Sequence, residues 1–322
     1  MLRSIQKLLT VQKRKEAFAM AAVTDLERGS RQVKTQNPGK FTAGKEEVPL
    51  LKETRKQSLA NKNESRLKAA KIGILGAKGG VGASTLALNL ALSLSKNGNT
   101  VTLVDGNLQQ PDIAVIFAKQ AEHSIVDFLA RSQDFDQKVW SACSLPMEQG
   151  KMASCRLLSG PADGSAATQA NLSQIANSLS CLEDFQDFLL VDLPKNLDKH
   201  LVTMLDKLDK IYLIFDGTLA CIAAAKRWQK IFAELGYEKE KLVMLHNRAG
   251  AKGQDCQHDL PSLLAGHELR KVPNSFVFLE ECSTFGEAAV YKNARDIFCK
   301  SVAKLADELT EERVGQSEGA GM

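Results

Sequence analysis

Residues 71–90 read KIGILGAKGGVGASTLALNL, and this stretch decides the fold. The apolar run at 71–76 suits a buried parallel strand. Beyond the glycines, Leu86, Leu90 and Leu94 recur at helical spacing. A helix that opens after a glycine-rich loop directs free N–H groups and the positive end of its dipole at the loop. The stretch therefore predicts a strand, an anion-binding loop and a helix in succession.

The loop has the form of a phosphate-binding P-loop whose usual lysine is replaced. A P-loop needs a Gly-Lys-Ser/Thr step, because its backbone N–H groups hold the phosphates, its lysine reaches the outer phosphates and its hydroxyl holds Mg²⁺. This chain has Gly82-Ala83-Ser84 at that step. Another lysine, Lys78, lies just before a pair of glycines. The alternative is an ordinary glycine-rich turn between a strand and a helix.

The order of apolar segments predicts the fold class. The 322 residues are 44% hydrophobic and 25% charged, which is typical of a globular protein. Short apolar runs alternate with helical segments, which predicts an α/β fold with a mostly parallel twisted sheet flanked by helices on both faces. The expected strands are 71–76, 100–105, 155–159, 187–192, 209–215, 241–246 and 268–272. The expected helices are 84–97, 124–131, 167–180, 197–206, 217–235, 276–283 and 291–312.

Positive charge is concentrated ahead of the predicted domain. Residues 1–70 contain 16 Lys and Arg against 7 Asp and Glu, whereas the remainder contains 26 against 31. Because this segment is polar and has no sustained apolar periodicity, we expect 1–68 to be largely disordered. Residues 2–22 fit a docking helix or a helix on a membrane surface, and the alternative is a frayed basic tail. The P-loop domain is expected over 69–313, followed by a flexible tail at 314–322.

The composition also bears on the compartment. No apolar stretch approaches the ~20 residues that a membrane-spanning helix needs, and the N-terminal residues have no apolar core like that of a signal peptide. The seven cysteines are scattered with no C-x-x-C pair, which favours reduced thiols. We therefore expect a cytoplasmic protein.

Two acidic residues end predicted strands. The strand TVTLVD ends at Asp105, and the strand DFLLVD ends at Asp192. Ligands of open α/β sheets bind at the carboxyl ends of the strands, where a carboxylate can support Mg²⁺ and its waters. The alternative for either residue is a helix N-cap or a loop carboxylate.

The segment AKGGVGAST at 77–85 resembles the deviant P-loop of the MinD/ParA superfamily, in which a lysine precedes the double glycine. The strings DGNLQQPDIAVIF, LLVDLPKNLD, KLVMLHNRAG and VPNS are similar to those of its CpaE/TadZ branch, which is associated with the assembly and placement of Tad/Flp-type pili. The resemblance covers residues 71–312. It implies a homodimer whose two copies face each other across two ATP molecules, with Lys78 touching the phosphates held by the partner.

Carried over by position, the resemblance implies a role for each residue of the site. ATP or ADP would be held by Lys78, Gly79, Gly80, Val81, Gly82, Ala83, Ser84 and Thr85. Mg²⁺ would be held by Ser84, Asp105 and Asp192, and the adenine by Asn247, Pro273 and Asn274. The catalytic positions are those of Lys78, Asp105 and Asn107.

Departures from the family pattern weaken the expected chemistry. Ala83 removes the lysine beside the outer phosphates, Ala77 replaces a usual glycine, and Asn107 stands where many relatives have the aspartate that orients the attacking water. Loss of one donor in such a site costs ~2.7–4 kcal/mol of transition-state stabilisation. We therefore expect a dimeric protein that binds ATP or ADP and hydrolyses ATP slowly or not at all. The receiver-like domain typical of the branch is expected to be absent, because only about 70 unpatterned residues precede the first strand.

Three functions compete. The favoured one is a nucleotide-binding positioning factor for a pilus or secretion machinery, recruited to a cell pole or to the inner face of the membrane by a protein partner that residues 2–22 contact. The second is an active ParA-, MinD- or FlhG-like ATPase that positions DNA, flagella or other cargo, and it predicts contact with DNA or a membrane surface. The third is a nucleotide-free scaffold in which the loop is only a structural turn.

Overall fold

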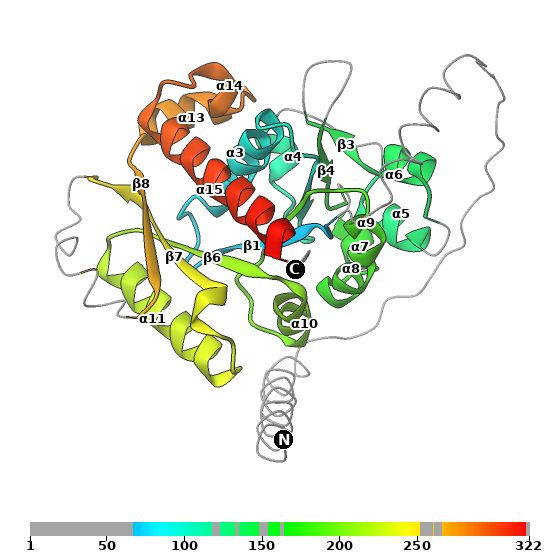
Figure 1. Cartoon of the computed structure of the whole chain (residues 1–322), viewed down its shortest axis with the longest axis horizontal. Helices are drawn as coiled ribbons and strands as arrows, with labels where there is room; N and C mark the ends of the chain where they lie inside the picture. Colours follow the sequence, from blue (N-terminus) through cyan, green and yellow to red (C-terminus); the bar gives the residue numbers. More distant parts are fainter. Residues whose placement is uncertain are drawn as a thin grey trace.

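The structure is a computed structural model, and it describes residues 67–117, 123–132, 135–147, 154–161, 164–251, 260 and 266–319. A central eight-stranded sheet is flanked by helices (Figure 1). The strands of the described residues are β1 (Ala70–Gly76), β2 (Val101–Asp105), β3 (Leu145–Pro146), β4 (Cys155–Leu158), β5 (Phe188–Leu193), β6 (Lys210–Phe215), β7 (Leu242–Ala249) and β8 (Glu268–Pro273). Their spatial order is β3-β4-β2-β5-β1-β6-β7-β8.

The sheet is parallel apart from the pairing of β3 with β4. β1 lies between β5 and β6, so the loop that follows β1 leaves the middle of the sheet. Because parallel strands share one carboxyl edge, the ends of β1, β2, β5 and β7 meet at that edge. The predicted mostly parallel α/β fold is confirmed.

The helices connect the strands and cover the sheet. They are α3 (Ala83–Lys96), α4 (Ile113–Ile116), α5 (Ile125–Ala130), α6 (Gln137–Cys143), α7 (Gly164–Ala167), α8 (Leu172–Ser178), α9 (Ser180–Glu183), α10 (Lys199–Lys207), α11 (Leu219–Glu234), α13 (Phe276–Thr284), α14 (Ala289–Lys292), α15 (Ile297–Gly319) and the 3₁₀ turn η2 (Lys239–Lys241). α3 packs against α15, and α8 packs against α10 (Figure 1).

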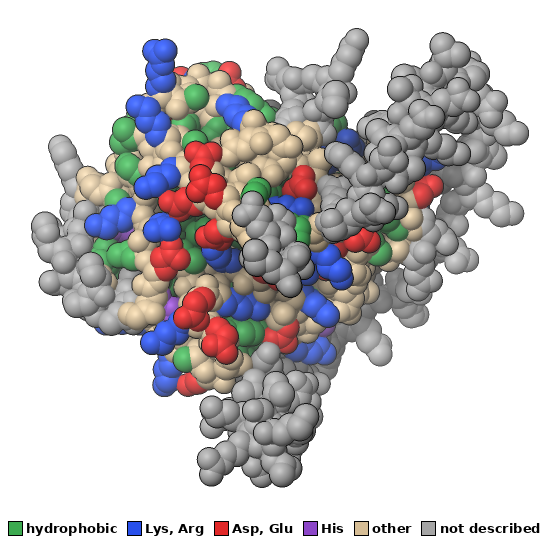
Figure 2. All heavy atoms as spheres, in the orientation of Figure 1, with side chains coloured by type: hydrophobic (Ala, Val, Ile, Leu, Met, Phe, Trp, Pro, Cys, Tyr) green, Lys and Arg blue, Asp and Glu red, His purple; other side chains and the backbone are tan. Residues whose placement is uncertain are grey.

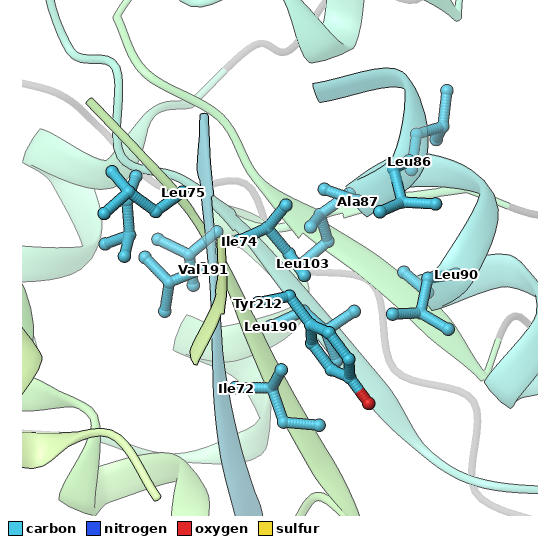
Figure 3. Close-up of a cluster of buried hydrophobic side chains, with 14 of the residues drawn as sticks. Ile72, Ile74, Leu75, Leu86, Ala87, Leu90, Leu103, Leu190, Val191 and Tyr212 are labelled. Atoms are coloured by element: carbon cyan, nitrogen blue, oxygen red, sulfur yellow. The ribbon is translucent and has the colours of Figure 1, made fainter. Parts of the chain in front are cut away.

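The two faces of the central strands bury different helices. Figure 3 shows Leu90 of α3 on the side of β1 that carries Ile74, whereas Leu75 points to the opposite side. On that opposite side, Gly73 leaves room for Leu208 at the end of α10, because a Cβ on Gly73 would lie 2.6 Å from Leu208 Cδ1. Ile74, Leu75 and Leu90 are fully buried, so β1 is fixed between two apolar layers and presents the loop after it as a rigid feature.

All seven expected strands are present, each within three residues of its expected ends. The short edge strand β3 was not expected, because two residues carry no periodicity. The helices expected near 84–97, 124–131, 197–206, 217–235 and 276–283 are also confirmed, as α3, α5, α10, α11 and α13. α4 and α6 were not expected.

Two segments that were each expected to form one continuous helix are interrupted. The helix expected over 167–180 is replaced by α7, α8 and α9, because Asn171 starts α8: its side chain accepts the N–H of Gln174 at 3.1 Å, and the Gln174 side chain accepts the N–H of Asn171 at 2.9 Å. The helix expected over 291–312 is replaced by α14 and α15. α15 continues to Gly319 and therefore occupies most of the segment that was expected to be a flexible tail.

The N-terminal prediction lies almost wholly outside the described residues. The docking helix expected over 2–22 and the disordered segment up to residue 66 stay predictions. The described chain begins against α15, where Arg313 donates hydrogen bonds to the carbonyls of Leu67 and Lys68. In the part of the chain that the structure describes, every helix is either too short or too polar to cross a lipid bilayer.

Candidate functional site

The glycine-rich loop runs from the end of β1 to the start of α3. Gly80 and Gly82 adopt positive φ angles of 75° and 88°, a region that side chains with a Cβ avoid. Gly82 is also the N-cap of α3, and no described side chain caps this helix. Its first N–H groups are therefore left for an anion, as the sequence predicts.

A cleft of about 510 Å³ opens over this loop. Of the predicted site residues, the following line it: Lys78, Gly80, Val81, Gly82, Ala83, Ser84, Thr85, Asn107 and Asp192. Gly79 is exposed and does not line this cleft. Asp112, Lys195 and Arg248 also line the cleft, and none of them was predicted from the sequence.

Ser84 and Asp192 form the oxygen-rich part of the cleft. The Ser84 hydroxyl donates a hydrogen bond to the Asp192 carboxylate. Burial raises the pKa of Asp192 to about 6, while the bond from Ser84 and the charge of Lys195 lower it. A hydroxyl and a carboxylate side by side suit Mg²⁺, a hard cation that prefers oxygen ligands. These two residues fit the metal ion that the motif implies.

Asp105 does not line the cleft. It lies beside Asp192 in the sheet register but is fully buried. Its carboxylate accepts the backbone N–H groups of Asn107 and Ile113, each at 3.2 Å. Burial and then the charge of Asp192 raise its pKa to about 7. These contacts fit the alternative, a loop carboxylate. The catalytic and metal-binding roles that the resemblance implied stay predictions.

Asn107 and Asp112 come from the loop after β2. The Asn107 side chain lines the cleft, and its amide nitrogen donates to the carbonyl of Gln110 at 2.8 Å. Asp112 is exposed, and its charge raises the pKa of both Asp105 and Asp192. Asp112 is thus the free carboxylate at this wall. The signal that could have found it is an acid at the position before a short helix, after a strand that ends in the site.

A second, smaller hollow of about 290 Å³ adjoins the loop at Gly82 and Thr85. Of the three predicted adenine contacts, Asn247 and Pro273 line it and Asn274 does not. The amide nitrogen of Asn247 donates to the carbonyl of Val81 at 2.7 Å, so this side chain also holds the loop.

Arg248 lies between the two hollows, and the sequence did not predict it as a site residue. It lines both of them, and it is the only described residue other than glycine with a positive φ, of 56°. Its guanidinium donates to the carbonyl of Gly80 at 2.9 Å and lies 5.2 Å from the ring centre of Phe276. A strand-end arginine has no distinctive sequence pattern, which is why only the fold reveals its place.

Comparisons with known proteins agree with the P-loop motif. The family model ParA, described as NUBPL iron-transfer P-loop NTPase, matches residues 68–271. An uncharacterized ATP-binding protein of Methanocaldococcus jannaschii is 24% identical over 212 residues, which cover 63% of this chain and 73% of that protein. An iron-sulfur cluster carrier protein of Aquifex aeolicus is 33% identical over 121 residues, which cover 36% of this chain and 30% of the carrier.

Solved structures show the same fold. The crystal structure of a ParA family ATPase from Chlorobium tepidum superposes with a TM-score of 0.68 at 20% identity, over 74% of this chain and 98% of the other. The septum site-determining protein MinD from Pyrococcus horikoshii, complexed with Mg-ADP, gives a TM-score of 0.63 at 19% identity, over 75% of this chain and 96% of MinD. At such identities the likeness concerns the fold.

Proposed function

The chain belongs to the ParA family of P-loop NTPases, and from this premise we propose that it binds ATP or ADP with Mg²⁺, forms a homodimer across the nucleotide and hydrolyses ATP slowly or not at all. In this proposal it acts as a positioning and assembly factor rather than as a fast enzyme. The observation that carries it is the cleft over the loop, where Ser84 and Asp192 are joined while position 83 offers only a methyl group.

The binding half of the proposal rests on the phosphate and metal ligands. The free N–H groups at the start of α3 suit phosphate oxygens, and Gly80 and Gly82 let the backbone approach them. Mg²⁺, when bound at Ser84 with Asp192 behind it, would neutralise charge on the phosphates. The smaller hollow lined by Asn247 and Pro273 is the proposed adenine site.

The weak-hydrolysis half rests on two side chains. Ala83 cannot donate to the outer phosphates, and each missing donor costs ~10²–10³ in rate. Asn107 is an amide that already donates to Gln110, and it cannot take a proton from water as a carboxylate could. In this proposal, the bound nucleotide supports the dimer and is hydrolysed slowly or not at all.

The proposal also names the machinery that this protein helps to assemble or position. The resemblance of the strings after β2, at β5 and at β7 to the CpaE/TadZ branch supports a role in Tad/Flp-type pilus or related secretion assembly. We propose that residues 2–22 contact a protein partner that recruits the chain to a cell pole or the inner face of the membrane, and that the P-loop domain begins near residue 69.

The matching family model is described as an iron-transfer NTPase, and the Aquifex aeolicus relative is an iron-sulfur cluster carrier. We do not favour iron transfer for this chain. Clusters are held by thiolates, and carriers need cysteines that reach one site together. The sequence has no C-x-x-C pair. Five of the six described cysteines are buried: Cys143, Cys155, Cys221, Cys282 and Cys299.

The face of the molecule that carries α15 does not favour DNA binding. Figure 2 shows Lys and Arg side chains interspersed with Asp and Glu over the face that carries α15. Several are paired, as Arg270 is with Glu268 and Glu308. A duplex-binding surface needs a continuous basic patch. This face lacks one among its described residues.

Two measurements test the proposed function. Isothermal titration of the full chain with ATP and ADP in the presence of Mg²⁺ is expected to show saturable binding, and steady-state phosphate release is expected to stay slow at every protein concentration. Absence of binding would favour the scaffold. Brisk turnover that rises with dimer formation would favour the active ATPase.

A further inference from the structure

Three cationic side chains reach the cleft of a site whose own P-loop lysine is missing. They are Lys78, Lys195 and Arg248. The structure distinguishes them by what each one already contacts.

Arg248 already makes two contacts within the protein. Its guanidinium donates to the Gly80 carbonyl and lies over the ring of Phe276. A guanidinium used in this way supports the loop and has fewer donors left for a ligand.

Lys78 lies on the β6 side of the loop. The preceding residue, Ala77, donates its N–H to the carbonyl of Ile214 at 2.8 Å. Burial raises the pKa of the Cys221 thiol, in the first turn of α11, to about 11, and the charge of Lys78 opposes this rise only weakly. Lys78 lines the same cleft as the Ser84–Asp192 pair, and its charge also acts on α11, which follows β6.

Lys195 lies on the β5 side, beside that pair. It follows Asp192 by three residues, after Pro194, whose ring fixes the backbone where the chain leaves the strand. Its ammonium nitrogen lies 3.1 Å from the point that a Cβ on Gly79 would occupy. Lys195 is exposed, and its ammonium forms no ion pair with any described carboxylate. A flexible cation therefore lies against the phosphate loop with its donors unused.

We propose that Lys195 is the phosphate-binding cation of this site, supplied within the same subunit in place of the lysine that Ala83 lacks. Its ligand is the outer phosphate of a nucleoside di- or triphosphate, so the inference rests on the proposed function. It differs from that proposal in one respect: Lys195 acts in a single copy of the chain, whereas Lys78 needs a facing partner.

The first experiment compares Lys195→Gln and Lys195→Arg with wild type in the full chain, by titration with ATP, ADP and AMP in the presence of Mg²⁺. One charged hydrogen bond lost to the outer phosphates should weaken ATP binding by about ten- to a hundred-fold. AMP, which lacks those phosphates, should bind within about two-fold of wild type. Lys195→Arg, which keeps the charge, should retain most of the ATP affinity. The matched control is Lys199→Gln, an exposed lysine outside the cleft wall, which should change nothing.

The second experiment restores the missing lysine. Adding Ala83→Lys to Lys195→Gln should recover the lost ATP affinity, because either lysine then supplies the same cation. Wild-type affinity in Lys195→Gln, or an equal loss for AMP and ATP, would overturn the inference while leaving the proposed function intact. Absence of binding to wild type overturns both. If the double variant does not fold, the contrast between Lys195→Gln and Lys195→Arg decides, with circular dichroism confirming that both are folded.

Discussion

The side-chain amide of Asn247 donates a hydrogen bond to the carbonyl of Val81 across 2.7 Å, and it joins the end of β7 to the phosphate loop. Both residues are nearly inaccessible to solvent. The residue expected to read the adenine thus also fixes the loop that holds the phosphates. In the proposed function, base recognition and loop geometry would depend on one side chain.

Asn247→Ala should therefore destabilise the fold as well as the site. It leaves a buried carbonyl without a donor, which costs about 1–3 kcal/mol of unfolding free energy. The measurement is urea denaturation without nucleotide. Asn196→Ala, an exposed asparagine of the same cleft, serves as the control and should stay within about 0.5 kcal/mol of wild type. Equal stability of the two variants would show that the bond does not matter.

Gly82→Ala and Gly80→Ala form a second matched pair. Both glycines have positive φ, so each alanine should cost about 1–2 kcal/mol in backbone strain. A Cβ on Gly82 would also lie 2.7 Å from the amide nitrogen of Asn247, whereas one on Gly80 meets nothing within 4 Å. Gly82→Ala should therefore lower the unfolding free energy more than Gly80→Ala. Calorimetric melting of both variants checks the order, and the reverse order would contradict this geometry.

The paired carboxylates predict how stability depends on pH. The pKa of Asp105 is raised to about 7 by burial and by Asp192, while an unfolded aspartate titrates near pH ~4. Between about pH 4 and pH 7 the folded chain holds the extra proton, so this group's contribution to the unfolding free energy decreases as pH rises. In the absence of divalent ions, the unfolding free energy of wild type should fall between pH 5 and pH 7.5, and this fall should be smaller in Asp105→Asn. Urea denaturation at a series of pH values measures both profiles.

The control for that experiment is Glu311→Gln, the same change of acid to amide at an exposed position. Its profile should follow that of wild type. If the Asp105→Asn profile also follows wild type, Asp105 is not protonated in the folded chain and the two carboxylates are not coupled as the structure indicates.

Much of this site could be predicted from local sequence. The glycines and Ser84 could be predicted because they lie in one continuous strand, turn and helix. Asp192 could be predicted because it ends an apolar strand. Lys195 and Arg248 could not be found in this way, because their places depend on β5 and β7 lying near β1, which only the sheet order shows. The position of the Asp105 side chain could not be predicted either, because a strand-end acid looks the same in sequence whether it faces the cleft or the backbone behind it.

The proposed metal ligands, Ser84 and Asp192, make a further prediction. Ser84→Ala should weaken the dependence of ATP affinity on Mg²⁺ by about ten-fold or more, since changes around a metal ligand typically cost 10–100-fold in metal affinity. Because the pKa of Asp192 is raised to about 6 and Mg²⁺ prefers the ionised form, the Mg²⁺ effect should also decline below pH 6. Titrations with Mg²⁺ and with EDTA measure both effects. Ser180→Ala, an exposed serine on α9, should leave them unchanged.

The final prediction is a gain of activity. If slow hydrolysis comes from Ala83 and Asn107, then Ala83→Lys combined with Asn107→Asp should raise ATP turnover by about 10²-fold or more. The first change adds a donor at the P-loop position itself, in addition to the cation proposed for Lys195, and the second adds a water-orienting acid. Asn196→Asp places a new carboxylate elsewhere on the cleft wall and controls for added charge alone. Phosphate release under saturating ATP measures the change. An unaltered rate in a variant that still binds ATP would mean that these two positions do not limit the chemistry, and that the loop must close or pair differently before hydrolysis can occur.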